Sequence, residues 1–273
     1  MEKQPRQAYP TDLKDAEYAI LESLVSNKSG KRGRPRTWTL HEILDAIFYI
    51  LRSGCAWRLM PHDLPPWQTV YGYYWRWSKD GTWEKVTTAL VPKVRVQDGG
   101  APHPSAAIID SQSVKTSEGG EERGVDVHKQ VNGRNRHILV DTVGFLLLVV
   151  VHSASSQDAA GGKATLQKLF DQIKHSVHNR WCRLKLVWAD GGYTNSVEWV
   201  QKNLGWKLEI KKRPQDAKGF VLLPRRWVVE RTFGWLGRYR RLSRDFEHTV
   251  SSSEAMVYAA SIRRMLRLLT TQT

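Results

Sequence analysis

Three acidic residues, Asp110, Asp190 and Glu230, stand where their carboxylates can act together. Asp110 and Asp190 each end a short apolar run typical of a buried strand, and open α/β sheets carry their sites at such strand ends. Glu230 lies in a basic and aromatic segment opened by Pro224, a residue suited to the first position of a helix. Carboxylates converging from separate elements can hold two Mg²⁺ ions, because hard divalent cations prefer oxygen ligands. Such an ion pair, about 3.5–4 Å apart, promotes phosphoryl transfer.

The same acids also have an ordinary explanation. An Asp after a strand is a frequent turn or helix-cap residue, and the chain holds 27 acidic residues. Other catalytic patterns are missing from the sequence, which has no phosphate-binding Gly-rich loop, no dinucleotide fingerprint and no Gly-x-Ser-x-Gly motif. Its nine histidines lack paired metal-ligand spacing. Two cysteines, Cys55 and Cys182, exclude a disulfide framework and a four-thiolate zinc site.

The charge of the chain indicates a polyanionic partner. Its 273 residues include 42 Lys and Arg against 27 Asp and Glu, a net charge of +15. Residues 211–244 hold eleven basic residues and two acids, and residues 28–36 hold five basic residues in nine positions. A single charged run is often just a solvated face. Two runs in so basic a chain favour contact with nucleic-acid phosphates.

The elements that must position the acids begin near residue 105. Short apolar runs predict strands over 105–110, 136–141, 145–151, 184–190 and 206–210. The second and third form a hairpin, and the continuously apolar 145–151 is expected near the middle of the sheet. Helices are predicted over 158–175, over 195–203, after Pro224, and from a capping box of Ser251 and Glu254 to about Leu269. This order predicts a mixed α/β sheet that fits an RNase H-like core, although other α/β folds share it.

The first third of the chain is predicted to be helical. Thr39 and Glu42 form a capping box for a helix that Gly54 ends, and an aromatic-rich helix follows over 67–79. Two helices joined by a turn beside basic residues are typical of a DNA-binding helix-turn-helix, while the aromatics also suit the core of a small helical domain. We expect an N-terminal helical domain over 1–97, a linker over 98–105 and a catalytic domain over 106–273.

The chain resembles the DDE transposases of bacterial insertion sequences, and among them the insertion-sequence-5 family. The matching stretches run in order from about residue 10 to the C-terminus: Arg36–Leu44, Ser53–Arg58, Leu64–Tyr71, Ile109–Ser113, Asn132–Asp141, Ala189–Tyr193 and Trp227–Leu236. The resemblance implies an RNase H-like catalytic domain behind a helical domain that helps to recognise transposon ends. It also implies that Asp110, Asp190 and Glu230 are the catalytic and metal-binding triad.

Two details of the sequence qualify this resemblance. Related transposases carry a Tyr, Arg, Glu, Lys signature around the last acid; here Arg226 and Glu230 match, whereas Leu223 and Gly237 stand at the Tyr and Lys positions. No role that depends on that Tyr or Lys is therefore carried over. Asp190 and Glu230 are 40 positions apart in the sequence, which leaves no room for the large inserted domain of some relatives.

The expected function is Mg²⁺-dependent cutting of DNA at terminal inverted repeats, followed by joining of the 3′-OH to target DNA. Two Mg²⁺ ions are expected, with Mn²⁺ as a substitute. Two alternatives remain: a catalytically silent DNA-binding protein derived from a transposase, and an RNase H-like nuclease without strand transfer. Expected phosphate contacts come from basic residues of both halves: Lys31, Arg32, Arg34, Arg36, Lys129, Arg134, Arg136, Arg226, Arg231, Arg238, Arg240 and Arg241.

The expected partners are double-stranded DNA, as inverted repeats and as target, and a second copy of the chain. A homodimer is expected because two transposon ends must be held together. The longest apolar stretch, 145–151, is too short to cross a bilayer, and the polar N-terminus lacks the apolar core of a signal peptide. We therefore expect a cytoplasmic, nucleoid-associated protein without a membrane partner.

Overall fold

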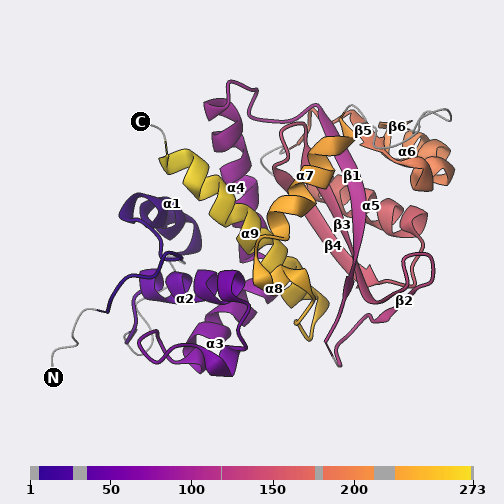
Figure 1. The fold of residues 1–273 in the computed structure, drawn as a ribbon. Coiled ribbons are helices and arrows are strands. Elements are labelled where there is room, and N and C mark those ends of the chain that lie inside the picture. The colour runs from indigo at the N-terminus through magenta and orange to yellow at the C-terminus, as the bar shows by residue number, and fades with distance from the viewer. Residues whose placement is uncertain (1–5, 27–35, 118, 176–180, 212–224, 272–273) are drawn as a thin grey trace.

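The structure is a computed structural model, which describes residues 6–26, 36–117, 119–175, 181–211 and 225–271. Figure 1 shows a helical part built by the N-terminal residues on one side and a sheet flanked by helices on the other. The last helix, α9 (Val250–Thr270), runs between these two parts. This arrangement confirms the predicted mixed α/β class with N-terminal helices.

The sheet combines antiparallel and parallel pairs. Its strands are β1 (Ala106–Lys115), β2 (Gly124–Asp126), β3 (Val131–Asp141), β4 (Leu146–Ser153), β5 (Leu186–Ala189) and β6 (Lys207–Ile210). They follow the order β2-β3-β1-β5-β6, and β4 also pairs with β3. Strand β3 pairs antiparallel with both β1 and β4. On the other side of β1, β5 pairs parallel with β1 and β6 pairs parallel with β5. A mixed sheet of this order is consistent with the predicted RNase H-like core.

Two expectations about the strands are corrected. The hairpin is present and β4 is largely buried, but among the described residues β4 pairs only with β3 and so lies at the edge of the sheet. Helices α5 (Asp158–His175) and α9 pack against it, which explains a continuous apolar run in an edge strand. Asp110 does not end its strand, because β1 continues to Lys115 in register with β3.

The helices after β4 mostly match their predicted ranges. They are α5, the 3₁₀ helix η2 (Gly191–Ser196), α6 (Val197–Leu204), α7 (Arg226–Leu236), α8 (Arg240–Ser243) and α9. The cap of α9 differs from the expected box, since the Thr249 side chain accepts from the Ser252 N–H at 3.2 Å. Glu254 instead accepts from the Val151 N–H at 3.0 Å and so joins α9 to β4.

The N-terminal part contains α1 (Asp15–Val25), α2 (Leu40–Ser53), the 3₁₀ helix η1 (Trp57–Leu59), α3 (Trp67–Lys79) and α4 (Thr82–Gln97). The predicted capping box of α2, its left-handed Gly54 and the bounds of α3 are confirmed. Tyr74 and Trp77 of α3 are buried, while Trp75 is 47% exposed. Most of these aromatics therefore build the helical core, and Trp75 faces outward.

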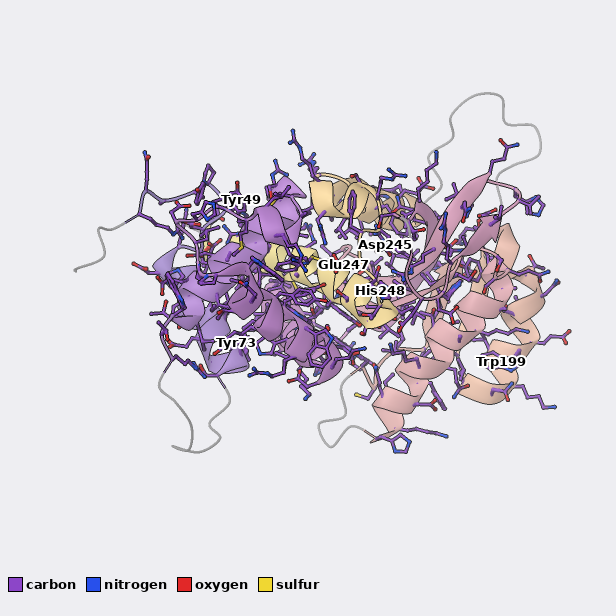
Figure 2. The ribbon with its side chains drawn as sticks, turned by 90° about the horizontal axis from the view of Figure 1, so that it is seen from below. Tyr49, Tyr73, Trp199, Asp245, Glu247 and His248 are labelled. Carbon is purple, nitrogen blue, oxygen red and sulfur yellow. The ribbon has the colours of Figure 1, made fainter. Side chains whose placement is uncertain are left out.

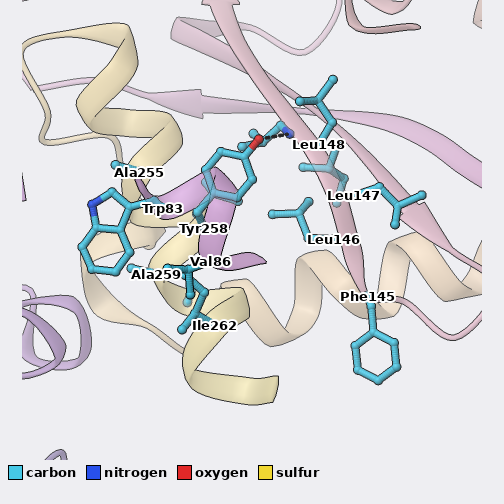
Figure 3. Close-up of a cluster of buried hydrophobic side chains, with 14 of the residues drawn as sticks. Trp83, Val86, Phe145, Leu146, Leu147, Leu148, Ala255, Tyr258, Ala259 and Ile262 are labelled. Atoms are coloured by element: carbon cyan, nitrogen blue, oxygen red, sulfur yellow. Dashed lines mark hydrogen bonds between the residues drawn. The ribbon is translucent and has the colours of Figure 1, made fainter. Parts of the chain in front are cut away.

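Helix α9 belongs to the core of both parts. Figure 3 shows Tyr258 and Ala259 of α9 between Trp83 and Val86 of α4 and the buried residues at the start of β4. The Tyr258 hydroxyl accepts from the Val149 N–H at 3.4 Å. The C-terminal helix thus fixes the N-terminal helices to the sheet. Within the described residues, none of the helices is both long and apolar enough to span a membrane.

Candidate active site

The three predicted acids converge on one guanidinium. Arg226 Nη2 lies 3.7 Å from Asp110 Oδ2, 3.9 Å from Asp190 Oδ2 and 3.6 Å from Glu230 Oε1. The acids come from β1, from the residue after β5 and from α7, three elements that are far apart in the sequence. The structure therefore brings the proposed triad together, with Arg226 at its centre.

The sheet and α7 explain this convergence. Strand β1 pairs parallel with β5, Ile108 opposite Trp188, so Asp110 and Asp190 follow these partners in the same direction. The Asp190 side chain accepts from the Gly192 N–H at 2.9 Å, which caps η2 and fixes the carboxylate. Helix α7 packs against β1, and the four-residue spacing of Arg226 and Glu230 puts both on one helical face.

The side chains of the three acids differ in how much of their surface is exposed to solvent. The side chain of Asp110 is 15% exposed, that of Asp190 34% and that of Glu230 48%. Burial raises the pKa of Asp110 to about 6, although the Ser111 N–H, which donates to it at 2.7 Å, and Arg226 act in the opposite direction. The site therefore has a buried side at β1 and an open side at α7, where a large substrate can approach.

A fourth acid, Asp158, supports the buried side of the site. It begins α5 and accepts from the Ser111 hydroxyl at 2.7 Å and from the Asn135 amide at 3.0 Å. Hydrogen bonds to the ionised form lower the pKa of Asp158 against the opposing effect of burial. The sequence did not predict a role for Asp158 in the site, because its position indicated only the start of a helix.

Two glycines of α5 allow the helix to pack closely behind the triad. A Cβ at Gly162 would lie 2.2 Å from the ring of Tyr193, and one at Gly161 would lie 2.3 Å from His152. His152 Nε2 is 2.7 Å from Nδ1 of the fully buried His137, and burial lowers the pKa of His137 to about 3. The Gly-Gly pair in the sequence was the available signal for this close packing.

Comparison with known families identifies the chain. Residues 13–87 match a family described as a putative transposase of the IS4/5 family, and residues 101–263 match the transposase DDE domain family. The chain belongs to the DDE transposases of insertion sequences. This membership confirms the resemblance found in the sequence.

One relative gives a weaker comparison for this transposase. An uncharacterized protein, y4sN, of Sinorhizobium fredii is 33% identical over 79 residues, which are 29% of the present chain. The match spans 62% of the length of that relative. No solved structure matches the transposase.

The three acids of this transposase supply the kind of ligand atoms that a divalent cation prefers. DDE transposase domains typically use divalent metal ions, and the three acids offer hard oxygen donors around one point. Within the described ranges, no group of three or more His, Cys, Asp or Glu side chains is arranged to hold a metal as it stands. The triad carboxylates are instead spread around the Arg226 guanidinium, which is the cation at this point.

Three of the arginines expected at DNA phosphates are corrected. Arg134, Arg136 and Arg241 are 0%, 2% and 6% exposed, so they face the interior. Arg134 and Arg136 lie 3.4 and 3.9 Å from Asp245 Oδ2, and Arg241 donates to Glu247 at 2.8 Å. Figure 2 shows Asp245 and Glu247 at the junction of the helical part and the sheet. These arginines stabilise the junction and are not available to phosphates.

The other basic residues of the transposase differ in their surroundings. Arg36, Arg238 and Arg240 are exposed, and Lys129 lies 3.7 Å from Asp126 and 3.9 Å from Asp158. Arg231 donates to the Val143 carbonyl at 2.8 Å and stacks on Trp227 and Trp235. Phosphate contact by these residues stays a prediction. Three further expected contacts lie outside the described residues: Lys31, Arg32 and Arg34.

Proposed function

We propose that this transposase cuts DNA at the terminal inverted repeats of an insertion sequence and joins the freed 3′-OH to target DNA. The observation that carries the proposal is the convergence of Asp110, Asp190 and Glu230 on one point, 3.6–3.9 Å from a single nitrogen. In this scheme water attacks the phosphodiester first, and the resulting 3′-OH attacks the target second. Both steps use one site and need no covalent protein–DNA intermediate.

The residues of the triad have separate roles in this proposal. Asp110 and Asp190 would hold two Mg²⁺ ions between them, and Glu230 would complete the ligands of one, with Mn²⁺ as a substitute. The bound ions would supply activation of the attacking oxygen and stabilisation of the leaving oxygen. Asp158 holds Ser111 and so supports the backbone beside Asp110. Arg226 lies 3.6 Å from Glu230 Oε1 at the open side, where its guanidinium would bind a DNA phosphate.

We further propose that the N-terminal residues 1–97 bind the transposon ends, that 98–105 act as a linker and that 106–273 form the catalytic domain. Trp75 on α3 and its neighbour Arg76 are exposed, which supports a contact surface on this helix. The expected DNA complex contains two copies of the chain, because two ends must be held together.

The experiment is a cleavage assay on labelled DNA that carries the ends of the element, with Mg²⁺, Mn²⁺ or EDTA. The wild-type protein is compared with Asp110→Asn, Glu230→Gln and the matched control Glu198→Gln, an exposed acid of α6. We expect metal-dependent nicking at the repeat boundary in wild type and control, and loss of nicking in both triad variants with DNA binding retained.

The outcomes separate the candidate functions. Cutting at the wild-type rate by either triad variant contradicts the proposed triad. End binding without cleavage by the wild type indicates the catalytically silent DNA-binding protein. Cleavage without preference for the repeats indicates a nuclease without strand transfer.

A further inference from the structure

Two histidines on neighbouring strands lie in contact beside the first turns of α5. His137 of β3 is fully buried, and His152 of β4 is half-buried. A Cβ at Gly161 would lie 2.3 Å from His152 Nε2 and 2.6 Å from His137 Cε1, so α5 packs directly on both rings. The ring of Tyr193 also packs on His137, edge to face, with the ring centres 6.0 Å apart. Close packing therefore holds the two imidazoles in one arrangement.

Every ring nitrogen of this histidine pair has a hydrogen-bond partner. His137 Nε2 lies 3.2 Å from the Asp158 carbonyl oxygen, and His152 Nδ1 lies 2.9 Å from the Ser153 carbonyl oxygen. The other two nitrogens, His137 Nδ1 and His152 Nε2, face each other at 2.7 Å. A carbonyl only accepts, so each outer nitrogen must carry a proton, and the contact between the two rings needs a third. Two neutral imidazoles carry two protons, one fewer than this geometry requires.

A second additional proton does not fit the pair. Burial lowers the pKa of His137 to about 3, and the charge of His152 acts in the same direction. Protonation of all four nitrogens would also set two N–H groups against each other across the 2.7 Å contact. One positive charge shared by the two rings therefore satisfies all three hydrogen bonds.

Asp158 supplies the negative charge that faces the pair. Its carboxylate favours the charged form of His137. The pKa of Asp158 itself is lowered despite its burial, because the Ser111 hydroxyl and the charge of Lys129 favour the ionised carboxylate. Lys129, 3.9 Å from Asp158 Oδ2, opposes a charge on His137. Burial raises the pKa of Tyr193, so the neighbours from η2 and β1, Tyr193 and Ser111, are neutral.

The histidine pair is connected to the triad through Asp158. His137 holds the carbonyl of this first residue of α5, whose Oδ1 accepts from the Ser111 hydroxyl at 2.7 Å. The Ser111 N–H in turn donates to Asp110 at 2.7 Å. We propose that His137 and His152 share one bound proton at neutral pH and position Asp110 through Asp158. The positioning role rests on the proposed function, whereas the shared proton does not depend on it.

The first test counts the ring protons by NMR on the full chain in EDTA, independently of cleavage. Nitrogen-15 spectra of the labelled histidines distinguish protonated from bare ring nitrogens, and contacts with Gly161 identify the two rings. We expect three protonated nitrogens of the four at pH 7, and two after the pair has lost its proton at higher pH. Two or four protonated nitrogens at pH 7 overturn the proposal.

The second test removes the charge that faces the pair. Asp158→Asn retains an oxygen that can accept from the Ser111 hydroxyl. The pH at which the pair loses its proton should fall by about one unit in this variant. Asp171→Asn, which changes an exposed acid of the same helix, is the matched control and should leave that pH unchanged. An equal pH in Asp158→Asn and wild type overturns the link between the pair and Asp158.

The third test separates a positioning role from a purely structural one. In His152→Gln the amide can donate to His137 Nδ1 without a charge, so the variant should hold Asp158 at every pH. The ratio of its cleavage rate to that of wild type should rise by about threefold or more from pH 7 to pH 9, as wild type loses the shared proton. His128→Gln, which changes an exposed histidine, should give a constant ratio.

The outcomes of the cleavage test keep the two proposals apart. A ratio for His152→Gln that does not change with pH overturns the positioning role of the pair. Absence of cleavage by the wild type contradicts the proposed function, and the count of ring protons then still decides whether the pair shares a proton.

Discussion

Arg226 and Glu230 lie one turn apart on α7, with Arg226 Nη2 3.6 Å from Glu230 Oε1. The same nitrogen also lies within 3.9 Å of Asp110 and Asp190, so one cation of the chain faces all three acids. Three carboxylates around one point repel each other unless a cation lies among them. Arg226 therefore stabilises the triad by the charge that a divalent ion would also supply.

Replacement of Arg226 by Gln should separate these two sources of charge. In EDTA we expect Arg226→Gln to lower the free energy of unfolding by about 1–2 kcal/mol, less than for a fully buried pair because Glu230 is half exposed. In Mn²⁺ we expect the variant to gain more stability than wild type. Thermal denaturation with EDTA or increasing Mn²⁺ measures both effects. Arg240→Gln is the control, and an equal gain from Mn²⁺ in wild type and Arg226→Gln would contradict the role of Arg226.

The raised pKa of Asp110 gives a pH-dependent prediction. The folded protein releases this proton near pH 6 and the unfolded chain near 3.8, so the unfolded state binds fewer protons between these values. Stability from this group therefore falls as pH rises through that window. In EDTA, Asp110→Asn should be more stable than wild type at pH 8, by roughly 3 kcal/mol at most, and nearly equal at pH 4. Urea denaturation across this range measures it, and a difference independent of pH would argue against burial of the ionised carboxylate.

Local signals in the sequence predicted most elements correctly. The capping box of Thr39 and Glu42 and the left-handed Gly54 set the bounds of α2, because both act within a few residues. The apolar run after residue 145 predicted a buried strand but not its place in the sheet. Burial on both faces came from α5 and α9, and such long-range packing leaves no local mark on the strand.

The sequence predicted the three acids of the site, but neither the arginine that lies among them, Arg226, nor the supporting acid Asp158. The resemblance pointed to Asp110, Asp190 and Glu230, whereas the position of Arg226 among them depends on how α7 packs against β1. Basic residues were the least predictable. Arg134 and Arg136 read as phosphate contacts in the sequence, yet both are buried because Asp245, more than a hundred residues later, pairs with them.

Two glycines near the site should respond in opposite ways to Ala. Gly234 lies in the exposed face of α7, and a Cβ there meets open space, so Gly234→Ala should stabilise the protein by about 1 kcal/mol through helix propensity. Gly144 has φ +95°, and its Cβ would lie 2.8 Å from the Thr232 hydroxyl. Gly144→Ala should therefore destabilise by more than about 1 kcal/mol. Chemical denaturation of both variants tests the packing of α7, and destabilisation by Gly234→Ala would mean that this face is covered.

The buried pairing at Asp245 should be among the most sensitive places in the molecule. Asp245 is 1% exposed, lies 3.4 Å from Arg134, and accepts from the Ser253 hydroxyl at 2.5 Å. Asp245→Ala leaves two buried guanidinium groups without their carboxylate, which should lower the free energy of unfolding by about 3–5 kcal/mol. Glu198→Ala, which removes an exposed acid, should change it by less than about 0.5 kcal/mol. Urea denaturation compares the two, and a small effect at Asp245 would contradict the stabilising role of its pairing with Arg134 and Arg136.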